Sequence, residues 1–182
     1  MNALHLLTTR RSTKNLAAPA PDELQLDTII QAATQVPDHG HLTPWRFVVI
    51  RSETGMQRFC TILTDTVNQF NFGEEAMKKA QRVGNMAPMV IAVIASPKAN
   101  KKPEWEQHLS AGCAAYAAQL AAKAQGFDSV WLSGLWVNSP LLKEAFACTE
   151  KEKIIALLMV GTATCHEDRP KNTDAAEFTQ YW

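Results

Sequence analysis

Five consecutive residues near the start of the chain combine three cations with two hydroxyl groups. Arg10, Arg11 and Lys14 flank Ser12 and Thr13. Arginine and lysine hold phosphate groups through charge-assisted hydrogen bonds, and a fixed positive charge also stabilises an electron-rich ring. The segment therefore indicates an anion site, although a solvated basic turn would show the same residue types.

Two histidines, His39 and His41, lie in a turn-rich loop over residues 37–45. Imidazoles so close together are candidate metal ligands, and they titrate near neutral pH. Catalytic zinc takes three protein ligands, however, and the other ligand-rich stretch, residues 165–168, is a run of neighbours that rarely converges on one ion. We therefore expect no metal site.

A third candidate is the stretch Trp131, Leu132, Ser133 and Gly134, which leaves an expected strand. Its glycine permits the backbone to approach a ligand closely. Several common motifs are absent from the chain: the dinucleotide-binding G-x-G-x-x-G, the P-loop, H-E-x-x-H and G-x-S-x-G. A Rossmann site, a P-loop and these two hydrolase signatures are therefore not expected.

Hydrophobic periodicity predicts the elements that must position these residues. A helix should begin after Pro21 and Asp22 and end near Val36, because Pro37 disfavours helical geometry in the residue before it. Further helices are expected over 56–70, 103–125 and 141–146, and strands over 47–51, 89–95, 129–132 and 154–160. This order predicts a three-layer α/β/α fold of the α+β class, with a mixed central sheet flanked by helices.

The helix expected over 103–125 is apolar almost all round. One face carries Trp105, Leu109, Gly112, Cys113, Tyr116 and Leu120, and the opposite face carries Ala111, Ala114, Ala115, Ala118 and Ala122. Such a helix is usually buried on every side. One small chain can hardly cover it, so we expect a second subunit to supply part of the cover. Gly126 should end the helix.

Length and charge narrow the class of protein. The 182 residues suit a single domain over 1–182, and 18 Lys plus Arg balance 18 Asp plus Glu. Zero net charge argues against nucleic-acid binding, and no stretch is apolar enough to span a membrane. No export signal precedes Arg10, and the four cysteines are widely spaced, so we expect a cytoplasmic protein with reduced thiols.

Several short motifs, in order along the whole chain, resemble the short-chain bacterial branch of the FMN-dependent nitroreductase family. Each motif is weak alone, and their order and spacing make the resemblance specific. They are R-R-S-x-K (10–14), P-x-x-x-x-x-T-P-W-x-F (37–47), E-x-x-x-S-A-G-C-A (106–114), A-x-x-Q-G-F (122–127), W-x-S-G (131–134) and V-G-T (160–162).

The resemblance implies a homodimer with FMN at the subunit interface and a C-terminal tail that reaches the partner. By position, the phosphate and one ring edge of FMN should be held by Arg10, Arg11, Ser12 and Lys14. The partner subunit's flavin should be faced by Gln35, Pro37 and His39, and the flavin ring lined by Trp131, Leu132, Ser133 and Gly134. The tail candidates for the phosphate are Arg169 and Lys171.

The family's activity implies that NAD(P)H delivers hydride to FMN and that a nitroaromatic, quinone or similar oxidised acceptor then takes the electrons, in a ping-pong sequence. No side chain is expected to act as an indispensable catalytic group, since the chemistry belongs to the flavin. Three alternatives stay open: a flavoenzyme dedicated to one metabolite, a flavin-binding protein without activity, and a metal-dependent hydrolase using His39, His41 and His166.

Overall fold

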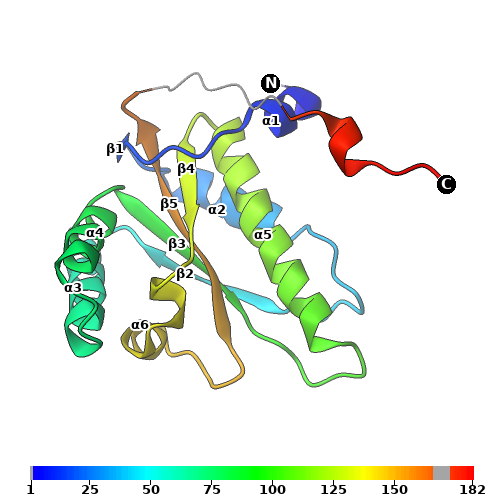
Figure 1. Ribbon diagram of the computed structural model, residues 1–182. Coiled ribbons are helices and arrows are strands. Elements are labelled where there is room, and N and C mark those ends of the chain that lie inside the picture. Colours follow the sequence, from blue (N-terminus) through cyan, green and yellow to red (C-terminus); the bar gives the residue numbers. More distant parts are fainter. Residues whose placement is uncertain (1, 166–172) are drawn as a thin grey trace.

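The computed structural model describes residues 2–165 and 173–182, and it has three layers (Figure 1). The helices are α1 Ala3–Thr9, α2 Glu23–Ala33, α3 Glu53–Gln69, α4 Glu74–Gly84, α5 Glu104–Ala124 and α6 Pro140–Ala145. The strands are β1 Leu16–Ala17, β2 Trp45–Ile50, β3 Met89–Ala95, β4 Asp128–Leu132 and β5 Lys153–Ala163. Two short 3-10 turns, η1 and η2, cover Trp136–Asn138 and Ala175–Phe178.

The sheet is antiparallel at every pairing in the described ranges, which corrects our expectation of a mixed sheet. β5 lies between β3 and β4, while β2 pairs with β3 and β1 with the end of β5. The crossover from β3 through α5 to β4 makes those two strands parallel. They are not neighbours, because β5 inserts between them and runs antiparallel to both.

The two central strands bury side chains on both faces. In β3, Met89, Ile91 and Val93 face one core, while alternate residues face the other, as the period of two requires. The register shifts between Val93, which faces Ala156, and Ile94, which faces Ile154. The extra residue in β5 lets Ile154 and Ala156 point to opposite faces of the sheet.

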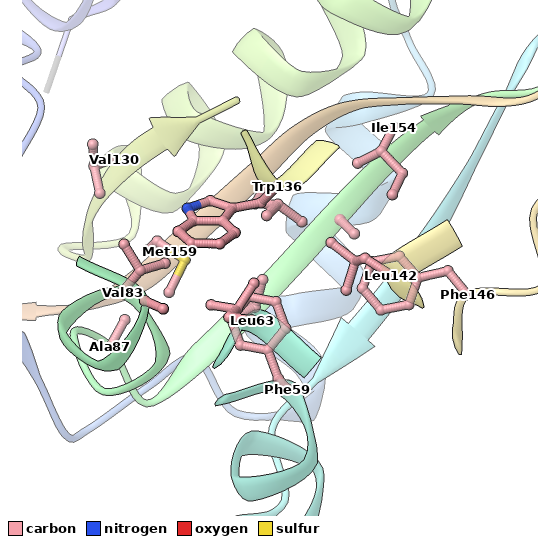
Figure 2. Packing of buried hydrophobic residues seen from close by; sticks show 14 of the residues in the cluster. Phe59, Leu63, Val83, Ala87, Val130, Trp136, Leu142, Phe146, Ile154 and Met159 are labelled. Atoms are coloured by element: carbon pink, nitrogen blue, oxygen red, sulfur yellow. The ribbon is translucent and has the colours of Figure 1, made fainter. Parts of the chain in front are cut away.

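Each face of the sheet carries its own core. α3, α4, α6 and η1 cover one face, and Figure 2 shows the indole of Trp136 lying among Met159, Val83 and Leu63 there. α2 and α5 cover the other face, where the alanines of α5 pack against the sheet. Figure 1 shows α5 crossing the sheet on the side away from α3 and α4. The three-layer arrangement that the sequence predicted is thereby confirmed.

The single chain covers helix α5 on its small-residue face, and the expectation that a second subunit covers the opposite face stays a prediction. Its small-residue face is buried against the chain's own sheet. The opposite face is exposed in the single chain: Trp105 is 61% exposed and Leu109 60%, and Cys113 and Tyr116 are exposed too. Large apolar side chains aligned on one open face mark a surface for another protein.

The predicted helix ends are confirmed at α5 and shifted at α2. Gly126, with φ +91°, follows α5, and the N–H of Phe127 donates to the carbonyl of Ala122, as in a Schellman motif. α2 begins with a capping box between Asp22 and Gln25, but it ends at Ala33, three residues before Val36. The elements α1, α4 and β1 had no defined bounds in the sequence prediction.

Candidate active site

The basic segment after α1 crosses the ends of two strands. The N–H of Thr13 donates to the carbonyl of Ser129 in β4 at 3.1 Å. Two residues later, the carbonyl of Asn15 accepts from the N–H of Thr164 at 3.0 Å, next to the β1–β5 pairing. These backbone bonds fix the course of the segment, so its side chains extend toward α5 at one end and α4 at the other.

Arg10 contains a buried group that lacks a hydrogen-bond partner. Its guanidinium carbon lies 5.9 Å from the centre of the Tyr116 ring of α5, and its buried Nη1 has no hydrogen-bond partner among the described residues. A buried charged donor without an acceptor is costly. The neighbouring Arg11 donates to the carbonyls of Thr8 and Arg10, and Ser12 is exposed. Arg10 therefore marks a place suited to an external acceptor.

Lys14 lies in a hollow of about 520 Å³ at the other end of the segment. The hollow is also lined by Arg82 and Asn85 from the end of α4, and by Thr164. The two cations offer donors to one anion, whereas the Asn85 amide already donates to the carbonyl of Gln81 and the Thr164 hydroxyl to that of Asn15. Arg82 and Asn85 were missed in the sequence because α4 was not predicted, although Ala76, Met77, Ala80 and Val83 show helical spacing.

The stretch 131–134 comprises the last two residues of β4, whose start Thr13 contacts, and the two residues after it. Within the described residues β4 pairs only with β5, and the carbonyl of Ser129 faces away from β5 because it accepts from Thr13. By the period of two, the backbone groups of Trp131 face the same way, and β4 ends at Leu132. Ser133 and Gly134 are exposed, and Gly134 has φ +55°. The edge of β4 that faces away from β5 is about 10 Å long between Ser129 and Leu132.

The loop over residues 37–45 that carries His39 and His41, here the histidine loop, lies at the other end of α5. Gln35 and Pro37 line a hollow of about 390 Å³ with Asp38 and His41. His39 does not line that hollow. Its Nδ1 lies 2.6 Å from Oε2 of Glu106, in the first turn of α5. In the described part of the chain, no three His, Cys, Asp or Glu side chains are placed to share a metal ion.

The structure thus brings together one part of the predicted site and separates another. Arg10 and Lys14 lie along the segment that crosses β4, and that segment is joined at Thr13 to Ser129, two residues before the stretch 131–134 begins. The histidine loop contacts α5 at Glu106, ten residues before Tyr116, and that interval spans about 15 Å of helix. The remaining candidates, Arg169 and Lys171, lie outside the described residues, as does His166.

Among the described groups, perturbed pKa values lie elsewhere, at the start of β5. The guanidinium of Arg46 donates to both carboxylate oxygens of Glu152, at 2.7 and 3.0 Å. Mainly for this reason the pKa of Glu152 falls to about 2. Burial raises the pKa of the nearby Cys148 thiol. This cluster fixes β2 to the turn before β5 and lies apart from the basic segment, which contacts the far end of β5.

Comparison with solved structures identifies the class of fold. A nitroreductase-like protein from Bacillus cereus superposes with a TM-score of 0.85 at 21% identity, covering 100% of this chain and 96% of the other. A candidate nitroreductase from Exiguobacterium sibiricum, solved in complex with FMN, gives a TM-score of 0.79 at 18% identity, covering 100% and 98%. The three-layer α+β fold is therefore the nitroreductase-like fold.

Sequence comparison identifies the family. A profile of the Nitroreductase family matches residues 7–162, so the chain belongs to that family and with it to the oxidoreductases. A Haemophilus influenzae protein is 49% identical and YdjA of Escherichia coli strain K12 is 41% identical, each over 100% of both chains. Both are named as candidate NAD(P)H nitroreductases.

No helix in the described ranges is long and apolar enough to cross a membrane.

Proposed function

We propose that this protein is an FMN-dependent oxidoreductase that takes hydride from NAD(P)H and passes electrons to a nitroaromatic, quinone or similar oxidised acceptor. The observation that carries the proposal is the buried Nη1 of Arg10, unpartnered among the described residues, at one end of a basic segment whose other end lines a hollow with two further cations. Similar proteins support the donor and the cofactor in this proposal: the proteins from Haemophilus influenzae and Escherichia coli are named for NAD(P)H, and the Exiguobacterium protein was solved in complex with FMN.

The residues fit FMN in three respects. Lys14 and Arg82 line one hollow and would hold the phosphate there. Arg10 offers a buried donor and a positive charge that stabilises negative charge on a ring. The open edge of β4 at Trp131 offers backbone groups to a planar ligand, and Ser133 follows directly after the strand.

When bound, FMN supplies the two-electron chemistry. The chain's own residues bind and orient it and provide fixed charge. Trp131 and Leu132, both half-buried, form an apolar wall, and the exposed backbone at Ser133 and Gly134 leaves hydrogen-bonding groups for the ring edge.

A second copy of the chain completes the site in this proposal. Residues 10–14 and the histidine loop lie about 15 Å apart along α5, on and beside its exposed face. In the proposed dimer, the two α5 helices pack antiparallel about a two-fold axis that passes near position 111. Position 106 of one helix then meets position 116 of the other, because both are five residues from the axis. The neighbouring Gly112 has open space around its Cβ position, so the helices can approach closely there.

We expect Gly112→Leu to disrupt this dimer without unfolding the chain. A side chain at position 112 meets nothing in its own chain, and leucine favours a helix more than glycine does. Overpacking the crossing should weaken the dimer at least about tenfold. Analytical ultracentrifugation measures the change, with Ala124→Leu, at an exposed position of the same helix, as the control. A Gly112→Leu protein that dimerises like wild type would contradict the crossing.

The absorption spectrum tests the proposed cofactor and donor. Purified protein mixed with FMN and passed through a desalting column should keep bands near those of free flavin, and anaerobic NADPH or NADH should bleach them. Menadione or a nitroaromatic should restore them. A colourless eluate, or bound flavin that neither nucleotide bleaches, would overturn the proposal.

A further inference from the structure

The loop over residues 37–44 holds an unfavourable backbone conformation. Gly40, His41 and Thr43 all have positive φ, at 89°, 53° and 46°. Glycine tolerates this region, but for a β-branched residue such as threonine it is a strained conformation. Such a conformation persists only where surrounding contacts hold it, so specific contacts must stabilise this loop.

Two carboxylates hold the loop. Asp38 acts from inside it, because its Oδ2 accepts from the N–H of Thr43 at 2.7 Å. Glu106 acts from α5, through the 2.6 Å contact between its Oε2 and Nδ1 of His39. The side chain of Glu106 is 26% exposed and that of His39 57%. The helix side of this contact is therefore the fixed one, and the loop side is the one that is held.

The contact also determines which atom of His39 is available. An ionised carboxylate only accepts hydrogen bonds, so Nδ1 carries the hydrogen. Nε2, across the ring, then remains for another partner. The alkyl part of Lys102 approaches the loop at Gly40, 3.5 Å from the place that a Cβ there would occupy. The ring orientation and the tautomer are thus both set by Glu106.

We propose that Glu106 is a positioning residue for the acceptor: it fixes the 37–44 loop and His39 Nε2 at the edge of the partner subunit's flavin site. This rests on the proposed function, since that dimer brings the partner's Glu106 and its loop beside Arg10. The loop then bounds the space in which an oxidised ring is seated, and a loosened loop seats it poorly.

The first experiment uses the protein without cofactor and reads out the loop alone. Hydrogen exchange at the amides of His41 and Thr43 should be about fivefold faster in Glu106→Ala, as expected for loss of a partly exposed charge-assisted bond. Glu106→Gln should restore most of the protection, because its amide oxygen also accepts from Nδ1. The matched control is Glu104→Gln, two residues before Glu106 in the same helix. The Oε1 of Glu104 lies 3.6 Å from Nε2 of His108 rather than on the loop, so this variant should exchange like wild type. Unchanged exchange in Glu106→Ala would overturn the inference.

The second experiment uses the FMN-loaded protein. Oxidation of the reduced protein by menadione should be about tenfold slower in Glu106→Ala, while oxidation by ferricyanide, which needs no seated ring, should be unchanged. An equal loss with both oxidants, or none with menadione, would refute a positioning role. Failure to bind FMN in wild type would instead refute the proposed function, and the exchange result would still judge the loop contact by itself.

Discussion

Replacing Arg10 and Lys14 together by alanine should abolish retention of FMN. Arg10 has a buried donor that nothing in the described chain satisfies, and Lys14 lines the hollow with Arg82. Two charge-assisted hydrogen bonds together contribute about 3 kcal/mol or more, so the Kd for FMN should rise at least about a hundredfold. Quenching of FMN fluorescence on titration with protein measures this Kd.

The matched control removes two positive charges elsewhere. Lys151→Ala with Lys153→Ala changes the net charge equally, at the start of β5 rather than at its end. Its Kd for FMN should equal that of wild type. Arg82→Ala alone should weaken binding too, because Arg82 shares the hollow with Lys14. A double variant at positions 10 and 14 that stays yellow would remove the basic segment from the site.

Glu152→Gln should destabilise the fold by about 3 kcal/mol at neutral pH. The carboxylate is 8% exposed and accepts from Nε and Nη2 of Arg46 and from the N–H of Thr149. Its pKa in the folded protein is about 2, against a usual value of 4.5. Each unit of difference corresponds to about 1.4 kcal/mol between the two protonation states. Urea unfolding at pH 7 measures the loss.

The sign of the pH dependence follows from the lowered pKa. The folded state favours the ionised form of Glu152, so its contribution to stability is fully present above pH 4.5 and is lost as the pH falls from 4.5 toward 2. The difference between wild type and Glu152→Gln should therefore shrink in that range. Glu150→Gln, at an exposed position of the same turn, should show no such loss. A difference that grows on acidification would contradict the assignment.

Elements whose pattern is local were predictable from the sequence. The continuous apolar runs of β3 and β5 predicted strands there, and the end of α5 was predicted from Gly126. The helix α4 was predictable in principle from its apolar spacing. β1 was not, because its two residues, Leu16 and Ala17, are a strand only through pairing with β5.

The site divides in the same way. The cations at 10–14 and the loop at 37–45 were recognisable as candidates, since their residue types limit the chemistry that they can perform. In the sequence, Glu106 was recognised only as one position of a family motif. Its role could not be predicted there, because its contact with His39 joins positions 67 residues apart. Arg82 likewise reaches the Lys14 hollow only because α4 ends beside β1.

The sequence by itself determined the residue types available, the helix and strand periods, and membership of the family. The tertiary structure alone decided which side chains meet: β5 enters between β3 and β4 and makes the sheet antiparallel, and α5 turns its alanines inward and leaves Trp105 and Leu109 exposed. The physical reason is that periodicity records a preference of each segment, whereas strand order and the choice of buried face depend on packing between segments far apart in the chain.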